Sequence, residues 1–157
     1  MNKHELIDKI RRLPDQLEEL VAGLTAAQLT ARPLAGEWSI AQNVHHLADS
    51  HLNSYIRCKL TLTEHEPPLK PYDQNVWAGQ PDGCSADITA SLALLRGLHG
   101  RWVIFWGNLK DGDWDRAGIH GERGRVTLAD QLRYYAAHGE GHLAQIQQVL
   151  DADRDER

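Results

Sequence analysis

A long amphipathic helix is predicted around the stretch Tyr135-Ala136-Ala137-His138-Gly139-Glu140-Gly141-His142-Leu143-Ala144-Gln145-Ile146. His138 and His142 are four residues apart, so on a helix they lie one above the other on the same face. Two imidazoles at this spacing can reach one metal ion. The same spacing also arises by chance in a chain with nine histidines, so two unrelated histidines are the competing interpretation. A third ligand on a facing helix would favour the metal.

The periodicity around this stretch extends in both directions. Thr127 and Asp130 predict the start of the helix, in an acidic variant of the capping box. The inward stripe is then Leu128, Leu132, Tyr135, His142, Ile146 and Val149, and His138 borders it. Gly139 and Gly141 each cost such a helix about 0.8–1 kcal/mol relative to Ala. Their presence indicates that another helix or a ligand approaches closely.

Three further segments have helical periodicity, and no segment has the alternation of a strand. The first carries an apolar stripe at Leu6, Ile10, Leu13, Leu17, Leu20 and Leu24. Pro14 lies inside it and is expected to kink the helix or interrupt one hydrogen bond. The second segment begins near Trp38-Ser39-Ile40. The third runs over residues 88–109, after a cap expected at Ser85 or Asp87. These segments predict an all-α fold.

The second helical segment has an unusual polar face, which consists of Asn43, His46, Ser50, Asn53 and Arg57. A solvated helix face is the simpler interpretation, but such faces usually carry Lys and Glu, and this one holds a single charge at its far end. The composition therefore favours the lining of a polar pocket, with His46 as the third ligand. His99, on the third segment, is the rival ligand. His99 and His51 are more simply interpreted as hydrogen-bonded core residues.

Composition excludes several classes of partner. The 17 Lys and Arg against 22 Asp and Glu give a net charge of -5, and no long basic run is present, so nucleic-acid binding is not expected. No apolar stretch reaches membrane-spanning length, and the first residues lack a signal-peptide core. We expect a single cytoplasmic domain over residues 1–157 that does not bind membranes. A loop of about twenty residues, 63–84, holds four prolines and is expected to be either a functional lid or a locally packed segment.

Several stretches resemble a known family. Gly36-Glu37-Trp38-Ser39-Ile40-Ala41-Gln42-Asn43-Val44-His45-His46-Leu47-Ala48-Asp49-Ser50-His51 resembles the second-helix signature of the DinB superfamily, and further runs resemble its YfiT-type branch of metal-dependent hydrolases. These runs are 53–57, 59–64, 70–73, 91–95 and 98–102, together with the final His-x-x-x-His helix. The resemblance implies a four-helix bundle, with the long loop between its second and third helices. It also implies a cytoplasmic homodimer that binds one divalent metal ion through His46, His138 and His142.

The function implied by the resemblance is hydrolysis of a small molecule, with a metal activating water. Zn²⁺ is the first expectation, and Ni²⁺ is an alternative because imidazole suits several metals. Asn43, Ser50, Asn53 and Arg57 are the expected substrate-binding residues. A second reading comes from relatives that join thiols such as bacillithiol to electrophiles: the site would then be a metal-dependent S-transferase. A third is a non-catalytic module that binds a metal or a small ligand.

Overall fold

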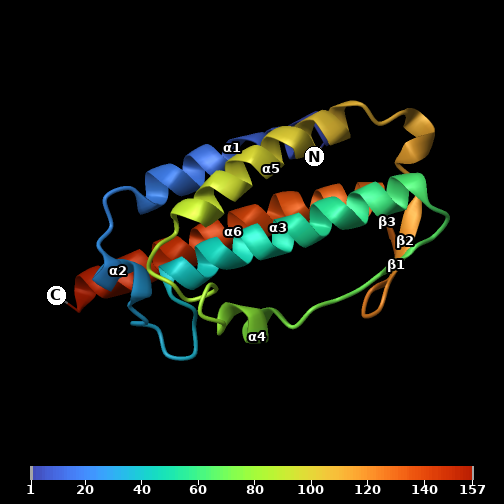
Figure 1. Ribbon diagram of the computed structural model, residues 1–157. Coiled ribbons are helices and arrows are strands. Elements are labelled where there is room, and N and C mark those ends of the chain that lie inside the picture. The colour runs from blue at the N-terminus through green and yellow to red at the C-terminus, as the bar shows by residue number, and fades with distance from the viewer. Residues whose placement is uncertain (1, 157) are drawn as a thin grey trace.

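The computed structural model describes residues 2–156, and its long helices form a four-helix bundle (Figure 1). These helices are α1 (Lys3–Val21), α3 (Ile40–Thr63), α5 (Thr89–Gly107) and α6 (Leu128–Asp155). Helices α1 and α3 each pack against both α5 and α6. The four-helix bundle is therefore confirmed, and its interior is where the predicted functional residues of α3 and α6 can meet.

Helices α3 and α6 each begin directly after a capping residue. Ser39 caps α3, and Thr127 caps α6 in a capping box with Asp130, as the sequence predicted. At α5 the capping position is Ile88, although Asp87 accepts a hydrogen bond from the Thr89 amide at 3.0 Å. These caps fix where α3 and α6 begin and therefore which of their residues face the bundle interior.

The sequence indicates no strand, but the structure adds three short strands to the helical bundle. A small sheet of order β1-β2-β3 joins β1 (Pro68–Leu69), β2 (Ala117–His120) and β3 (Gly124–Thr127). Strand β1 runs parallel to β2, and β2 runs antiparallel to β3. Strands of two to four residues are too short to show an alternating pattern. The turn before β3 places Gly124 at φ +72°, a conformation that favours glycine.

The remaining elements are short and belong to the connections. They are α2 (Ala26–Thr30), α4 (Gln74–Ala78) and the 3₁₀ turn η1 (Asp111–Asp113). The segment 63–84, expected as a lid or as a locally packed segment, contains β1 and α4, and α4 packs beside α3 (Figure 1). Tyr72 and Trp77 of this segment pack ring to ring, with centroids 4.4 Å apart.

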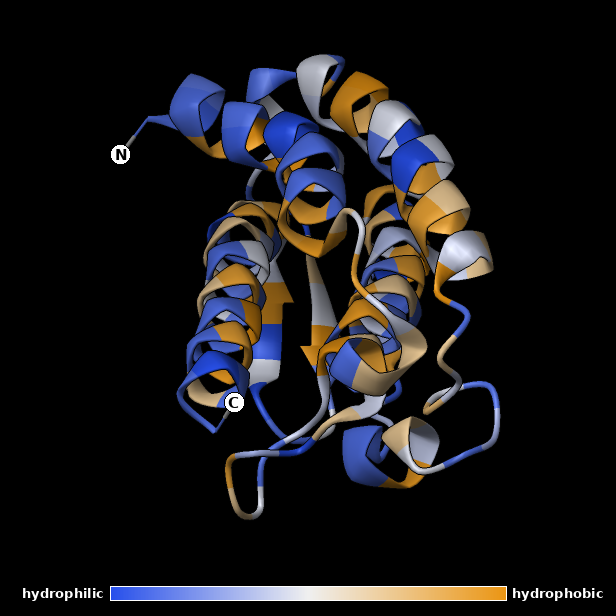
Figure 2. Cartoon of the chain, turned by 90° about the vertical axis from the view of Figure 1, so that its left-hand side faces the viewer, coloured by the Kyte–Doolittle hydropathy of each residue, from blue (hydrophilic) through white to orange (hydrophobic). Residues whose placement is uncertain are grey.

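The core consists of two apolar clusters. The first includes Leu17, Leu47 and Ile146, and the second includes Trp102 and Leu132. Figure 2 shows hydrophobic residues on the sides of the long helices that face one another. Hydrophobic burial in these clusters supplies the main stabilisation of the bundle.

The two glycines of α6 differ in their surroundings. A Cβ at Gly139 would lie 3.0 Å from Leu13 Cδ2, so the predicted close approach of another helix is confirmed there. A Cβ at Gly141 would meet nothing within 4 Å, and nothing in the structure explains that glycine.

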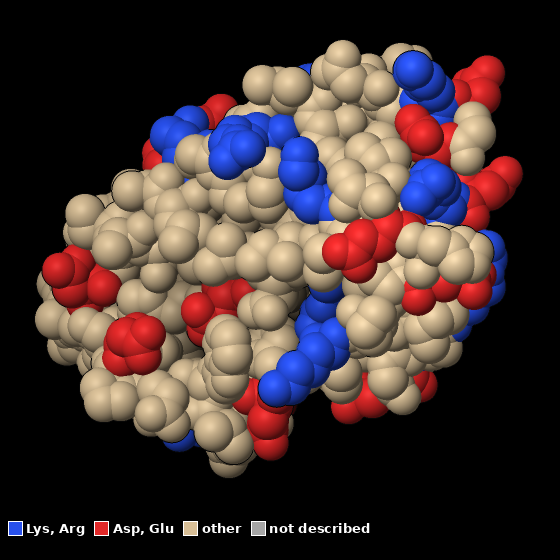
Figure 3. Space-filling model, turned by 45° about the vertical axis from the view of Figure 1, so that its right-hand side comes forward, with Lys and Arg blue, Asp and Glu red and all other residues tan. Residues whose placement is uncertain are grey.

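The surface agrees with the modest net charge. On the face shown in Figure 3, Lys and Arg side chains are interspersed with Asp and Glu and form no continuous basic patch. None of the helices within residues 2–156 combines the length with the apolar composition that a membrane span requires.

Candidate metal centre

Three histidines converge between α3 and α6. His46 comes from α3, and His138 and His142 come from successive turns of α6. One ring nitrogen of each lies within 4.8 Å of those of the other two. Among residues 2–156, no Cys, Asp, Glu or further His joins this group. The structure thus brings together the three residues that the sequence singled out as ligands.

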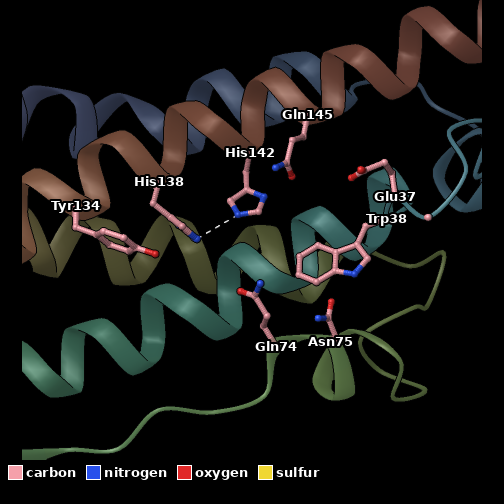
Figure 4. Close-up of a pocket in the computed structure, with 9 residues that line it drawn as sticks. Glu37, Trp38, Gln74, Asn75, Tyr134, His138, His142 and Gln145 are labelled. Carbon is pink, nitrogen blue, oxygen red and sulfur yellow. Dashed lines mark hydrogen bonds between the residues drawn. The ribbon is translucent and has the colours of Figure 1, made fainter. Parts of the chain in front are cut away.

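The spacing of these nitrogens suits a single ion. His138 Nε2 lies 3.2 Å from His46 Nε2 and 3.1 Å from His142 Nε2, and Figure 4 shows the latter pair. Two imidazole nitrogens bound to one tetrahedral Zn²⁺ at about 2.0–2.1 Å would be about 3.3–3.4 Å apart. Three such ligands with no fourth protein ligand leave a coordination position open, as in catalytic zinc sites.

Asn43 fixes the orientation of one candidate ligand. Its amide nitrogen donates to the Ser39 carbonyl at 3.0 Å, so its oxygen faces the His142 ring. That oxygen lies 2.8 Å from His142 Nδ1, which must therefore carry the proton and donate it. The His142 Nε2 lone pair is then left free. Metal-binding histidines are usually held by such a hydrogen bond from their other ring nitrogen.

Burial keeps the three rings neutral. It lowers the pKa of His46 to about 3, with a further contribution from His142. Burial, followed by the neighbouring His142 and His46, lowers the pKa of His138 to about 2. Burial likewise lowers the pKa of His142 to about 4. Each ring is thus deprotonated at neutral pH, which is the state that a metal ion requires.

The other residues of the predicted polar stripe lie in different places. Asn43 is 1% exposed and holds His142. Ser50 and Arg57 are buried and line a cavity beside His138, and an Arg57 nitrogen donates to the Lys70 carbonyl. Asn53 is half-buried, donates to the Asp49 carbonyl at 2.8 Å and lines neither of the two cavities that His138 borders.

Three other histidines of α3 and α5, namely His45, His51 and His99, are buried and hydrogen-bonded. His51 is 0% exposed and His99 is 1% exposed, and their rings are joined at 2.7 Å. Their interpretation as core histidines is confirmed. His45 is also buried, but its ring nitrogens contact Ser91 Oγ and the Ser85 carbonyl, away from the metal centre.

A cavity of about 310 Å³ opens beside the histidines. Its lining, most of which Figure 4 shows, is Gly36, Glu37, Trp38, Gln74, Asn75, Tyr134, His138, His142 and Gln145. Of these residues, only the two histidines were predicted from the sequence to belong to the site. Several come from connecting segments without periodicity. Tyr134 could have been found, because it precedes His138 by four residues and its ring stacks on that of His138.

A second cavity, of about 170 Å³, also borders His138 and Tyr134. Its cationic side chains are Arg57 and Arg123, and His120 lines it as well. The Arg123 guanidinium lies 4.4 Å from the centre of the Tyr134 ring, within the range of a cation–π contact. Glu122 lines the same cavity, so its two guanidinium groups face one carboxylate. The candidate metal centre therefore adjoins two cavities, one of which has an excess of positive charge.

Known proteins share this sequence and fold. The family model of the DinB superfamily matches residues 9–146. The protein from Bacillus subtilis (strain 168) named "Putative metal-dependent hydrolase YfiT" is 40% identical over 148 residues, which cover 94% of this chain and 83% of that protein. A protein from Oceanobacillus iheyensis, also named a "Putative metal-dependent hydrolase", is 41% identical over 143 residues, which cover 91% of this chain and 83% of that protein.

A solved structure agrees with these sequence matches. Bacillus subtilis YfiT, described there as "a probable metal-dependent hydrolase with an unusual four-helix bundle topology", superposes with a TM-score of 0.90 at 40% identity. The match covers 94% of this chain and 85% of that one. The bundle, the three converging histidines and these matches agree: the chain belongs to the DinB superfamily, and its two relatives above carry the name "Putative metal-dependent hydrolase".

Proposed function

We propose that the chain is a metal-dependent hydrolase of small molecules, with one divalent ion, Zn²⁺ first, held by His46, His138 and His142. The observation that carries this proposal is the convergence of three neutral imidazoles beside an open cavity, with no fourth protein ligand among the described residues. When bound, the ion would supply Lewis acidity and lower the pKa of coordinated water. The names of the relatives support the same reaction class.

The protein's own contribution to hydrolysis is orientation and proton transfer. Asn43 holds the His142 ring in one tautomer. Within residues 2–156, Glu37 is the one carboxylate that lines the first cavity, and Figure 4 shows it on the side of Gln145. We assign Glu37 the role of general base, because a carboxylate at the cavity can accept a proton from water. The residue is exposed, so it can also exchange that proton with solvent.

The second cavity would select the substrate. Arg57 and Arg123 give it two guanidinium groups, whose planar donors suit a carboxylate or phosphate. We therefore propose that the substrate carries an anionic group, bound here while its reactive bond lies near the histidines. Ser50 lines the same cavity. Asn53 lines neither cavity, and the present geometry supports no substrate-binding role for it.

Thiol transfer is the alternative, and one observation favours it. No carboxylate is hydrogen-bonded to the three histidines within residues 2–156, and Glu37 is exposed. A bound metal ion would itself lower the pKa of a thiol, so this reaction would need no protein base. In that case the two guanidinium groups of the second cavity would hold the thiol's acidic group.

A paired screen tests the proposal. Zinc-loaded protein is assayed against ester and amide libraries and, separately, against thiol and electrophile pairs, with the Glu37→Gln variant beside the wild type. Hydrolysis without thiol that falls by about 10²–10⁴-fold in Glu37→Gln supports the hydrolase and its base. Turnover that requires thiol and is unchanged in Glu37→Gln replaces it with the S-transferase. Metal binding without either activity leaves only the binding module.

A further inference from the structure

Two histidines that are not candidate ligands connect the metal centre to α1. His138 Nδ1 lies 3.1 Å from His51 Nε2. His51 Nδ1 lies 2.7 Å from His99 Nε2. His99 Nδ1 lies 2.6 Å from the backbone carbonyl of Ile10. An unbroken chain of hydrogen bonds thus runs through the bundle interior from α6 through α3 and α5 to α1.

The end of this chain determines the direction of every bond in it. A carbonyl oxygen only accepts, so His99 Nδ1 must carry the proton. A neutral imidazole has one N–H, so His99 Nε2 accepts from His51 Nδ1–H. For the same reason His51 Nε2 accepts from His138 Nδ1–H. His138 Nε2, the nitrogen that faces the other two candidate ligands, is then a free lone pair.

Pro14 explains why the Ile10 carbonyl is available. Inside a helix, the carbonyl of residue 10 would accept the amide hydrogen of residue 14. Residue 14 is a proline within α1 and has no N–H. The interrupted hydrogen bond that the sequence predicted therefore releases this carbonyl, and His99 uses it. Pro14 and Ile10 are both buried, so no bulk water competes for the oxygen.

We infer that Pro14, Ile10, His99 and His51 form a positioning relay that holds His138 in its Nδ1–H tautomer and aims its Nε2 lone pair at the metal. Asn43 does the same for His142. The two lone pairs then face each other across 3.1 Å with no proton between them, an arrangement that a cation relieves. The step from His138 Nε2 to a metal ion rests on the proposed function. The tautomers of His138, His51 and His99 follow from the hydrogen bonds alone. His51 and His99 are positioning residues, since they act through His138.

Matched variants separate positioning from packing. His99→Gln keeps a donor for Ile10 and an acceptor for His51, whereas His99→Leu removes both. His45→Leu is the control, because His45 is equally a buried hydrogen-bonded histidine of the bundle but contacts Ser91 and Ser85 instead. Zinc affinity is measured by competition with a chelator on protein shown to be folded. We expect a loss of about 10- to 100-fold in His99→Leu, and little change in His99→Gln and His45→Leu.

The tautomers are measured directly in the metal-free wild type. Long-range ¹H–¹⁵N correlation spectra of histidine-labelled protein distinguish Nδ1–H from Nε2–H rings, so this test does not depend on any variant folding. We expect His138, His51 and His99 all as Nδ1–H. An Nε2–H ring at His138, or unchanged zinc affinity in folded His99→Leu, would overturn the relay. A wild type with the expected tautomers that binds no zinc would uphold the relay and refute the metal function instead.

Discussion

The apolar clusters and the histidine band of the bundle are built on opposite principles. The histidine band consists of His46, His51, His99, His138 and His142. Along α5 it separates Leu95 of one cluster from Trp102 of the other, and along α6 it lies between Ala136 and Ile146. The clusters gain stability by removing apolar surface from water. The band instead buries polar rings, which costs free energy unless each finds a partner.

This difference shows which part of the core serves the fold and which serves the site. Apolar residues at the five positions would pack without polar groups to satisfy, so the band is not the simplest way to stabilise a bundle. Its rings are joined to one another, to Asn43 and to the Ile10 carbonyl. Stability and metal affinity should therefore respond separately to changes in the two regions.

The largest expected effect is the loss of native stability in acid, caused by the histidine band. Burial lowers the pKa of His99, His142 and His46 to about 4, 4 and 3, from the ordinary 6.5. Below pH 6.5 the unfolded chain therefore binds more protons than the native one, and native stability falls as pH falls. Between pH 6.5 and its own lowered pKa, each ring reduces the free energy of unfolding by up to about 1.4 kcal/mol per pH unit.

Circular dichroism of metal-free protein checks this prediction. Since several rings act together against a total stability of about 5–15 kcal/mol, unfolding is expected well before the pH reaches 4. Zinc should move the midpoint of acid unfolding to lower pH, because it stabilises the native state. A metal-free protein that stays native down to pH 3 would contradict the neutral, buried band.

Shortening a side chain in an apolar cluster should lower the stability of the protein without changing its zinc affinity. Leu17 is 0% exposed and lies in the first cluster. Leu17→Ala is expected to cost about 2–5 kcal/mol of unfolding free energy, measured by urea denaturation. Zinc affinity of the folded protein should match that of the wild type. An affinity loss comparable to that of His99→Leu would show that the two regions are not separable.

The start of α6 offers a smaller test. The Thr127 side chain accepts from the Asp130 amide, and its hydroxyl donates to the Asp130 carboxylate at 2.7 Å. Thr127→Ala should cost about 1 kcal/mol, whereas Thr127→Ser should retain most of the stability, because it keeps the hydroxyl. Equal losses in the two variants would assign the effect to the methyl group rather than to the cap.

The glycines of α6 give the smallest effect, with a built-in comparison. Gly141→Ala should stabilise the protein by about 0.8–1 kcal/mol, because a Cβ there meets nothing within 4 Å. Gly139→Ala should gain less or lose stability, since its Cβ would press on Leu13. Thermal denaturation of the two variants compares them. A larger gain at Gly139 would mean that Leu13 yields without cost.

The sequence predicts the long helices and the three candidate ligands because both depend on a 3.6-residue period. His138 and His142 share one face of α6, and the polar stripe of α3 pointed to His46. The small sheet escaped prediction because its strands, such as β1 at Pro68–Leu69, are shorter than any readable pattern. Glu37 and Gln74 were missed for a related reason: they reach the cavity from connecting segments, whose course is set by tertiary packing.

The relay shows a subtler limit of prediction. Pro14 was predicted to kink its helix or interrupt one hydrogen bond, and His51 and His99 were predicted to be core histidines. The interrupted hydrogen bond and the two core histidines are present. Their connection depends on ring nitrogens of α3 and α5 meeting a carbonyl of α1. Spacing along one helix carries no information on such contacts between helices.

Metal content tests the central claim most directly. Elemental analysis of the purified wild type, of the His46→Ala/His138→Ala/His142→Ala triple variant and of the His45→Ala control is carried out after equal exposure to zinc. The account predicts about one ion per chain in the wild type and in His45→Ala, and none in the folded triple variant. Unchanged stoichiometry in the triple variant would contradict it.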